Sequence, residues 1–419
     1  MAERLGAAPA RLARRAARLF GYWRSERRTL KQGAAALTLS TSAGFVAGLT
    51  LAHITGTLDA FPGLIVLIPA AVGMKGTIFG AIGARLGTAN AAGLFEPNLR
   101  PGGVLRRNVS VAIVTTVSSS LWLAVLARLA TAAFGQESIS IWSLFAVSVI
   151  GGALGSALIL LVTVGLSVVS HRRRWDLDSV ATPLVTALGD MTTLPCLFLA
   201  TLLIRNPTTG AILGSLCLAG SVVALIRASA IEDAAVRRIV LEMTAVILLT
   251  PLFDILAGAL LRESQPELVA VPVLLALIPP FVSQAGALGG IFSSRITSKL
   301  QIGVITPRGL PEVPAVVDAS IVLGFAVLVF TLIGAIAYVL GGITGLGGMP
   351  SAGAVIGGTL LAGLLVTPVT IVAGYYIAVS TYRFGLDPDN HSVPVITSLL
   401  DLAGVAAILL VMRTSGVLP

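Results

Sequence analysis

Long apolar runs without alternation dominate this chain of 419 residues and leave few folds open to it. A run of about 20 apolar residues is long enough to cross the hydrocarbon core of a bilayer as a helix. In hydrocarbon only helices and closed barrels satisfy every backbone N–H and C=O group, and barrel strands would show a two-residue period that these runs lack. Charged residues make up 11% of the chain, whereas a soluble domain carries about 25%. The sequence therefore predicts an all-α, polytopic membrane protein.

Eleven runs are long enough to be membrane spans. They cover residues 33–57, 61–82, 108–133, 140–169, 179–204, 209–227, 239–261, 268–292, 314–341, 351–380 and 392–412. With the N-terminus in the cytoplasm, the inner side holds 23 of the 28 Lys and Arg residues, counting Arg227 at the inner end of its span. This is the positive-inside bias, so we expect a multi-pass protein of the cell membrane with a cytoplasmic N-terminus and an external C-terminus. The same distribution explains the net charge of +9 without nucleic acid, which leaves the lipid bilayer and ions as the expected partners.

The chain also repeats itself at an interval of about 210 residues. One set of residues is Pro69, Gly76, Gly80, Arg85, Thr88 and Gly93, with the counterparts Pro279, Gly286, Gly290, Arg295, Ser298 and Gly303. A second set is Asp176, Asp178, Pro183, Thr186 and Asp190, with the counterparts Asp387, Asp389, Pro394, Thr397 and Asp401. Internal repeats in transporters place the substrate path between the halves. Each repeat holds five spans, and the extra span at 209–227 lets both repeats run in the same direction, like two subunits of a dimer.

The repeat divides the chain into four parts. They are a basic cytoplasmic segment at 1–32, a first repeat at 33–205, a linking helix and loop at 206–238, and a second repeat at 239–419. Because one chain holds both halves, we expect it to work as a monomer.

Two aspartates, Asp190 and Asp401, occupy equivalent places deep in the fifth span of each repeat. A carboxylate at that depth costs about 2.5–3.5 kcal/mol on insertion scales, so a partner, a cavity or an ion must favour it. Thr186 and Thr397 lie one helical turn earlier on the same face. An oxygen-rich, anionic stripe of this kind suits Mg²⁺ as the transported ion, since Mg²⁺ takes oxygen ligands and keeps several of its waters. The alternative is a pair of structural aspartates that are hydrogen-bonded to neighbouring helices.

Further acids stand at the cytoplasmic mouth of the same two spans. They are Asp176 and Asp178 in the first repeat, and Asp387 and Asp389 in the second. A second cation site is one interpretation. Helix capping is the other, because Asp just before a helix commonly accepts a hydrogen bond from its first backbone N–H groups.

Two more charged residues lie inside predicted spans. We expect Lys75 either to neutralise one of the aspartates or to extend its amine to the inner surface. Asp254 has no counterpart in the first repeat, and we expect it to be an accessory ion contact.

At these residues the sequence resembles the MgtE family, in the two-unit form of the solute-carrier magnesium transporters. Residues 69–88 are similar to the family's Gly-x-x-Gly-Asn…Ser-Arg-Leu-Ser-Thr segment, and residues 387–401 are similar to its Asp-Pro-Asp-Asn…Pro…Asp helix. The resemblance covers both repeats. It implies that Asp190 and Asp401 match the pore-lining aspartate that binds Mg²⁺ between two five-helix units.

Two departures from the family pattern concern ion selectivity. The family's Asn after the second Gly is Thr77 in the first repeat and Ala287 in the second. Because both amide groups are lost, we expect weaker discrimination among divalent ions, so that Mn²⁺ or Co²⁺ is carried as well as Mg²⁺.

The sequence thus predicts a Mg²⁺ transporter or channel whose path runs between two pseudo-symmetric units. An exchanger coupled to Na⁺ or H⁺ is the alternative, because facing carboxylates also bind protons. An intramembrane aspartyl protease is a remote alternative, since the residues before Asp190 and Asp401 lack the Gly-x-Gly-Asp pattern. The chain shows no Walker loop, His-Glu-x-x-His motif or nucleophile elbow, so no enzymatic activity is expected.

Overall fold

The structure, a computed structural model, describes residues 27–91, 94–173, 177–204, 206–230, 233–345, 348–386 and 388–418, and every regular element within these ranges is an α-helix. The helices are α2 (Arg27–His53), α3 (Thr55–Ala60), α4 (Leu64–Ala91), α5 (Val104–Ala133), α6 (Ile141–Arg173), α7 (Leu177–Thr201), α8 (Pro207–Ser229), α9 (Ala234–Glu263), α10 (Gln265–Ala270), α11 (Pro272–Gln301), α12 (Val313–Thr344), α13 (Ala352–Arg383) and α14 (Pro388–Thr414). Ten of them are long and apolar enough to cross a membrane, and α7 contains a shorter apolar stretch, Ala187–Thr201. The prediction of an all-α polytopic membrane protein is confirmed.

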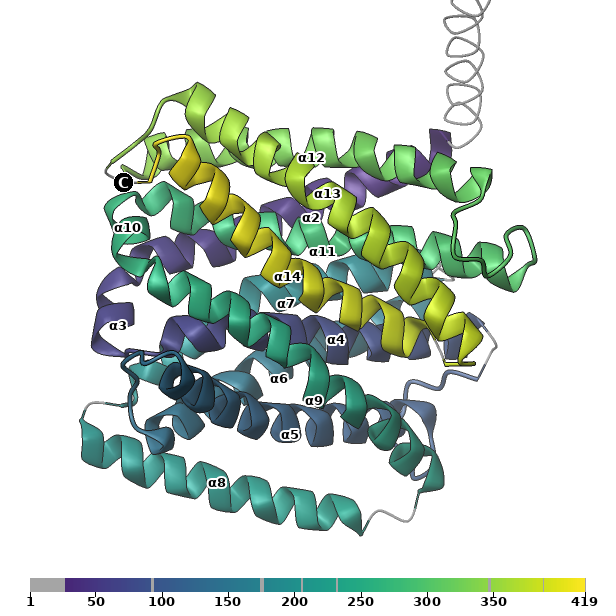
Figure 1. The fold of residues 1–419 in the computed structure, drawn as a ribbon. Coiled ribbons are helices and arrows are strands. Elements are labelled where there is room, and N and C mark those ends of the chain that lie inside the picture. The colour runs from purple at the N-terminus through teal and green to yellow at the C-terminus, as the bar shows by residue number, and fades with distance from the viewer. Residues whose placement is uncertain are drawn as a thin grey trace, which may run out of the picture.

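The order of the helices repeats once along the chain. Helices α2 to α7 have the same sequence of long and short elements as α9 to α14, and α8 lies between the two sets. The short helices α3 and α10 stand at the same end of the bundle, and the C-terminus lies at this end too (Figure 1). The two repeats therefore run in the same direction.

Two predicted spans begin or end at the wrong residue. The span predicted at 33–57 is interrupted at Ile54, where α2 has ended and the separate helix α3 follows. The span predicted at 268–292 includes a break at Val271, after which α11 starts with Pro272 in its first turn. Proline favours this position because the first N–H groups of a helix have no partner within it. Hydropathy did not detect these breaks because the interrupting residues are themselves apolar.

The first long helix of each repeat packs against the other repeat. Helix α2 lies against α11, and α9 lies against α4. Gly48 of α2 meets the backbone of Ala276, while Gly258 of α9 meets the backbone of Val66, so that neither glycine leaves room for a side chain. These two crossings are 210 residues apart in sequence and are equivalent. Small residues let transmembrane helices approach this closely, and here they bring the first helix of each repeat against the other repeat.

Helix α8 lies at the edge of the bundle (Figure 1). It packs against α6 and α5, and Gly214 meets the backbone of Trp142 there. Its N-terminus is closed by a capping box, in which Asn206 and Thr209 bond to each other's backbone N–H groups. The helix thus connects the repeats without entering the contact between them.

Candidate functional site: an acidic centre between the repeats

Three aspartates lie together where the repeats meet. Asp190 belongs to α7, Asp254 to α9 and Asp401 to α14, and their exposed fractions are 6%, 0% and 9%. The carboxyl groups of Asp254 and Asp401 both lie beside Gly73, and that of Asp190 is near enough to Asp401 to act on it electrostatically. The structure therefore brings the two equivalent aspartates of the sequence together and adds Asp254 to them. We call these three residues the acidic centre.

On the Asp190 side of the acidic centre, a hydroxyl group from the other repeat bonds to the carboxylate. Ser283 of α11 donates a hydrogen bond from Oγ to Oδ2 of Asp190, over 2.6 Å. The bond occupies one carboxylate oxygen and ties α7 to α11. Sequence reasoning missed Ser283, although the 210-residue interval makes it the counterpart of Gly73.

The Asp401 side is built differently. A methyl group added at Gly73 of α4 would lie 2.8 Å from Oδ2 of Asp254 and 3.5 Å from Oδ2 of Asp401, so the missing side chain makes room for two carboxylates. Ser398 of α14 donates to Oδ2 of Asp254 over 3.2 Å. The other oxygen of Asp254, Oδ1, is buried and has no hydrogen-bond partner among the described residues. This side is therefore the more acidic and the less satisfied of the two.

The threonine expected beside Asp401 bonds within its own helix. Thr397 donates its hydroxyl hydrogen to the carbonyl oxygen of Pro394 over 2.9 Å, and its side chain lies beside Gly286 of α11. Ser398 is the hydroxyl residue that reaches an acid. The other predicted site residues cannot be placed: the side chains of Thr186, Asp178 and Asp389, and the whole of Asp176 and Asp387, lie outside the described residues.

Lys75 takes neither of the roles expected for it. Its side chain is 4% exposed, so the expectation that its amine reaches the inner surface is wrong. The ammonium group donates to the carbonyl oxygen of Gly152 over 2.6 Å and to the hydroxyl of Ser156. Thr116 of α5 lies 2.9 Å from the same hydroxyl. These hydrogen bonds go to uncharged oxygens of α6 rather than to a carboxylate, and they tie α4 to α6 beside the acidic centre.

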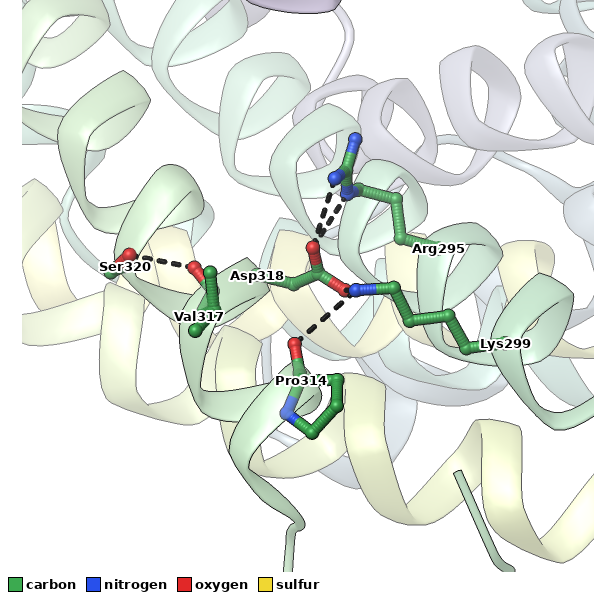
Figure 2. A network of polar contacts seen from close by, with 6 residues as sticks. All are labelled: Arg295, Lys299, Pro314, Val317, Asp318 and Ser320. Atoms are coloured by element: carbon green, nitrogen blue, oxygen red, sulfur yellow. Dashed lines mark hydrogen bonds and ion pairs between the residues drawn. The ribbon is translucent and has the colours of Figure 1, made fainter. Parts of the chain in front are cut away.

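A separate ion cluster holds α11 against α12 in the second repeat (Figure 2). Asp318 is fully buried; one of its oxygens lies 2.9 Å from Nη2 of Arg295, and the other lies 2.5 Å from Nζ of Lys299. Lys299 also donates to the carbonyl oxygen of Pro314 over 3.3 Å. In the first repeat, the residue 210 positions before Asp318 is the neutral Asn108. Sequence reasoning missed this cluster because its acid and its bases lie on different helices.

A surface cleft lies away from the acidic centre, between residues of α3, α9 and α10. It has a volume of about 820 Å³ and is lined by Asp59, Gln136, Glu137, Arg262, Glu263 and Gln265, with apolar neighbours. These residues belong to the end of the bundle that carries α3 and α10. The cleft is therefore a feature of one membrane surface and not of the centre.

The carboxylates of the acidic centre do not form a preassembled cage for a bare ion. Among the residues that the structure describes, no group of three His, Cys, Asp or Glu side chains could hold one metal ion. Mg²⁺ dehydrates reluctantly and is commonly held by one or two carboxylates while it keeps several waters. The geometry of the centre suits an ion bound in that way.

The fold and the acidic centre define a class of protein, a helical membrane protein in which two like-oriented repeats enclose buried acids suited to a cation. The family model for MgtE, described as a divalent cation transporter, matches residues 68–200 and 278–411. The chain belongs to this family, and its function is divalent cation transport. Members of the family are transporters and not enzymes. The matched segments include Asp190 and Asp401 but not Asp254. No curated protein and no solved structure matches the chain.

Proposed function

We propose that this chain carries Mg²⁺ along the interface between its two repeats, with Asp190 and Asp401 as ion contacts. The observation that carries the proposal is the meeting of these two acids, from equivalent helices, in a buried centre. When ionised, the three acids of the centre carry negative charge, and the hydroxyl groups of Ser283 and Ser398 that donate to them are neutral. A buried charge of this kind is costly unless it is compensated, and one divalent cation would compensate it.

The remaining site residues are proposed to line the path to the centre. Thr186 and Thr397 would supply oxygens one turn before the aspartates, and Asp176, Asp178, Asp387 and Asp389 would attract cations to the cytoplasmic mouth. In this proposal residues 33–205 and 239–419 are the transport units, with 1–32 as a basic cytoplasmic segment and 206–238 as the link. One chain then completes the path and works as a monomer.

Reconstitution into liposomes tests the proposal. The purified protein should carry Mg²⁺, and Mn²⁺ or Co²⁺ should compete with it, because Thr77 and Ala287 replace two amide groups beside the path. Restoring both amides, with Thr77→Asn and Ala287→Asn, should raise the preference for Mg²⁺ over Mn²⁺ by about threefold, which corresponds to about 0.7 kcal/mol. The measurement is Mg²⁺ uptake against increasing Mn²⁺ for the parent and the double variant.

The same liposomes separate the proposal from its alternatives. Uptake that needs an imposed Na⁺ or H⁺ gradient would identify an exchanger, whereas uptake driven by the Mg²⁺ gradient alone would identify a channel or uniporter. Strict selectivity for Mg²⁺ in the parent would show that positions 77 and 287 do not set the preference. If the folded, reconstituted protein carries no divalent cation, the proposed function is wrong.

The orientation in the membrane follows from the positive-inside bias and is tested by labelling. We expect a cysteine at Ser351, the exposed N-cap of α13, to react with an impermeant thiol reagent added outside intact cells. A cysteine at Leu310, which is 80% exposed between α11 and α12, should react only after the cells are opened. Labelling of both positions from the same side would contradict the proposed topology. The parent, with its own Cys196 and Cys217, is the control for background labelling.

A further inference from the structure

We propose that Asp254 and Asp401 together form the tightest divalent-cation site of this chain, displaced from the pseudo-twofold axis toward the second repeat. This inference rests on the proposed function and adds to it a third acid and an asymmetry. In a strictly symmetric centre, Asp190 and Asp401 would share the ion equally. The residues around the two aspartates differ, so the two sides cannot bind the ion equally.

The two sides of the centre differ at equivalent positions. At the interval of 210 residues, Ser283 is the counterpart of Gly73, and Gly44 is the counterpart of Asp254. On one side Ser283 fills its position and donates to Asp190. On the other side the glycine leaves its position empty, and the Asp254 carboxylate occupies the space beside Asp401. An uncharged donor on one side is thus replaced by a second carboxylate on the other.

The first repeat cannot form the same pair of acids. A methyl group added at Gly44 would lie 2.8 Å from the Cα atom of Pro280, which is backbone and cannot turn aside. An aspartate at position 44 would therefore push α2 away from α11. The crossing of these helices leaves Asp254 without an equivalent, so the asymmetry is built into the packing.

The unsatisfied oxygen of Asp254 points to a ligand. Its side chain is 0% exposed, and its Oδ1 atom has no partner among the described residues, while Oδ2 accepts the Ser398 hydroxyl. An unpaired buried polar atom destabilises the protein, and more so if it is charged. A hydrated divalent ion between Asp254 and Asp401 would satisfy this oxygen, and two carboxylates are the usual complement for Mg²⁺. On the other side, one Asp190 oxygen already has its donor.

The test measures Mn²⁺ binding to the purified full-length chain in nanodiscs, from the electron paramagnetic resonance signal of free Mn²⁺. Asp254→Asn should weaken the tightest site at least tenfold, and Asp401→Asn should do the same. Asp190→Asn should weaken it by less than either. Glu312→Gln, at the N-cap of α12 and outside the acidic centre, should leave the affinity unchanged within twofold and serves as the control.

A second pair of variants tests the space that Gly73 leaves beside the carboxylates, while all three acids stay in place. Gly73→Ala places a methyl group against the Asp254 carboxylate and should weaken Mn²⁺ binding more than Ser283→Ala does at the equivalent position. This pair decides the question if Asp254→Asn fails to fold. Wild-type affinity in Asp254→Asn, together with loss in Asp401→Asn, would overturn the inference and leave the proposed function standing. Wild-type affinity in Asp401→Asn would overturn both.

Discussion

Asp401→Asn and Asp190→Asn should each reduce Mg²⁺ flux into liposomes at least tenfold while the protein stays folded. Each change keeps the shape of the side chain and removes one negative charge from the path. Two unit charges 4 Å apart interact by about 4 kcal/mol at an effective dielectric constant of about 20, and the divalent ion doubles this attraction. Because about 1.4 kcal/mol corresponds to a factor of ten, even partial screening leaves a large loss.

The matched control for these variants is Asp59→Asn, an exposed carboxylate in the remote surface cleft. It should keep its flux within about twofold of the parent, since exposed charges interact weakly through solvent. Monodisperse elution and unchanged helical circular dichroism would establish that each variant is folded. Near-parental flux in both Asp190→Asn and Asp401→Asn would show that neither residue is an ion contact in the path.

The largest expected effect on stability belongs to Asp318→Asn. The substitution leaves Arg295 and Lys299 without the carboxylate that contacts both of them (Figure 2). Breaking a fully buried ion pair costs about 3–5 kcal/mol, and the partial exposure of the two bases reduces the expected loss to about 2–3 kcal/mol. Thermal unfolding in detergent should therefore occur several degrees lower, while the acidic centre keeps its affinity for Mn²⁺.

Asp233→Asn is the matched control for this prediction. Asp233 pairs with Arg107 over 2.6 Å, but both side chains are partly exposed, and an asparagine can still cap the first turn of α9. A pair of this kind contributes about 0–1 kcal/mol. If the two variants lose the same stability, burial of Asp318 is not what makes its ion cluster important.

The sequence was sufficient to predict the features that recur. Asp190 and Asp401 could be found because the same residue appears twice at the same depth, and the helical class followed from the long apolar runs. The features that occur once were harder to predict. Asp254 could be recognised from the sequence as a charged residue without a counterpart in the first repeat. Its position beside Asp401 depends on which helices α9 crosses, and no local sequence pattern predicts that crossing.

The roles of Lys75 and Gly73 could not be predicted from the sequence either. The charge of Lys75 was visible, but its hydrogen bonds to Gly152 and Ser156 depend on how closely α6 approaches α4. Gly73 lies in the segment 69–88 that resembles the family, and its lack of a side chain makes room for two carboxylates in one place. Both roles follow from packing between helices far apart in the chain.

The packing of α2 and α9 against the opposite repeat affects how the protein is made. During synthesis α2 is made well before its close partner α11, which is translated only after six further long helices. Until then the Gly48 face of α2 has no Ala276 backbone to pack against. The first half therefore cannot reach its final packing until α11 has been made.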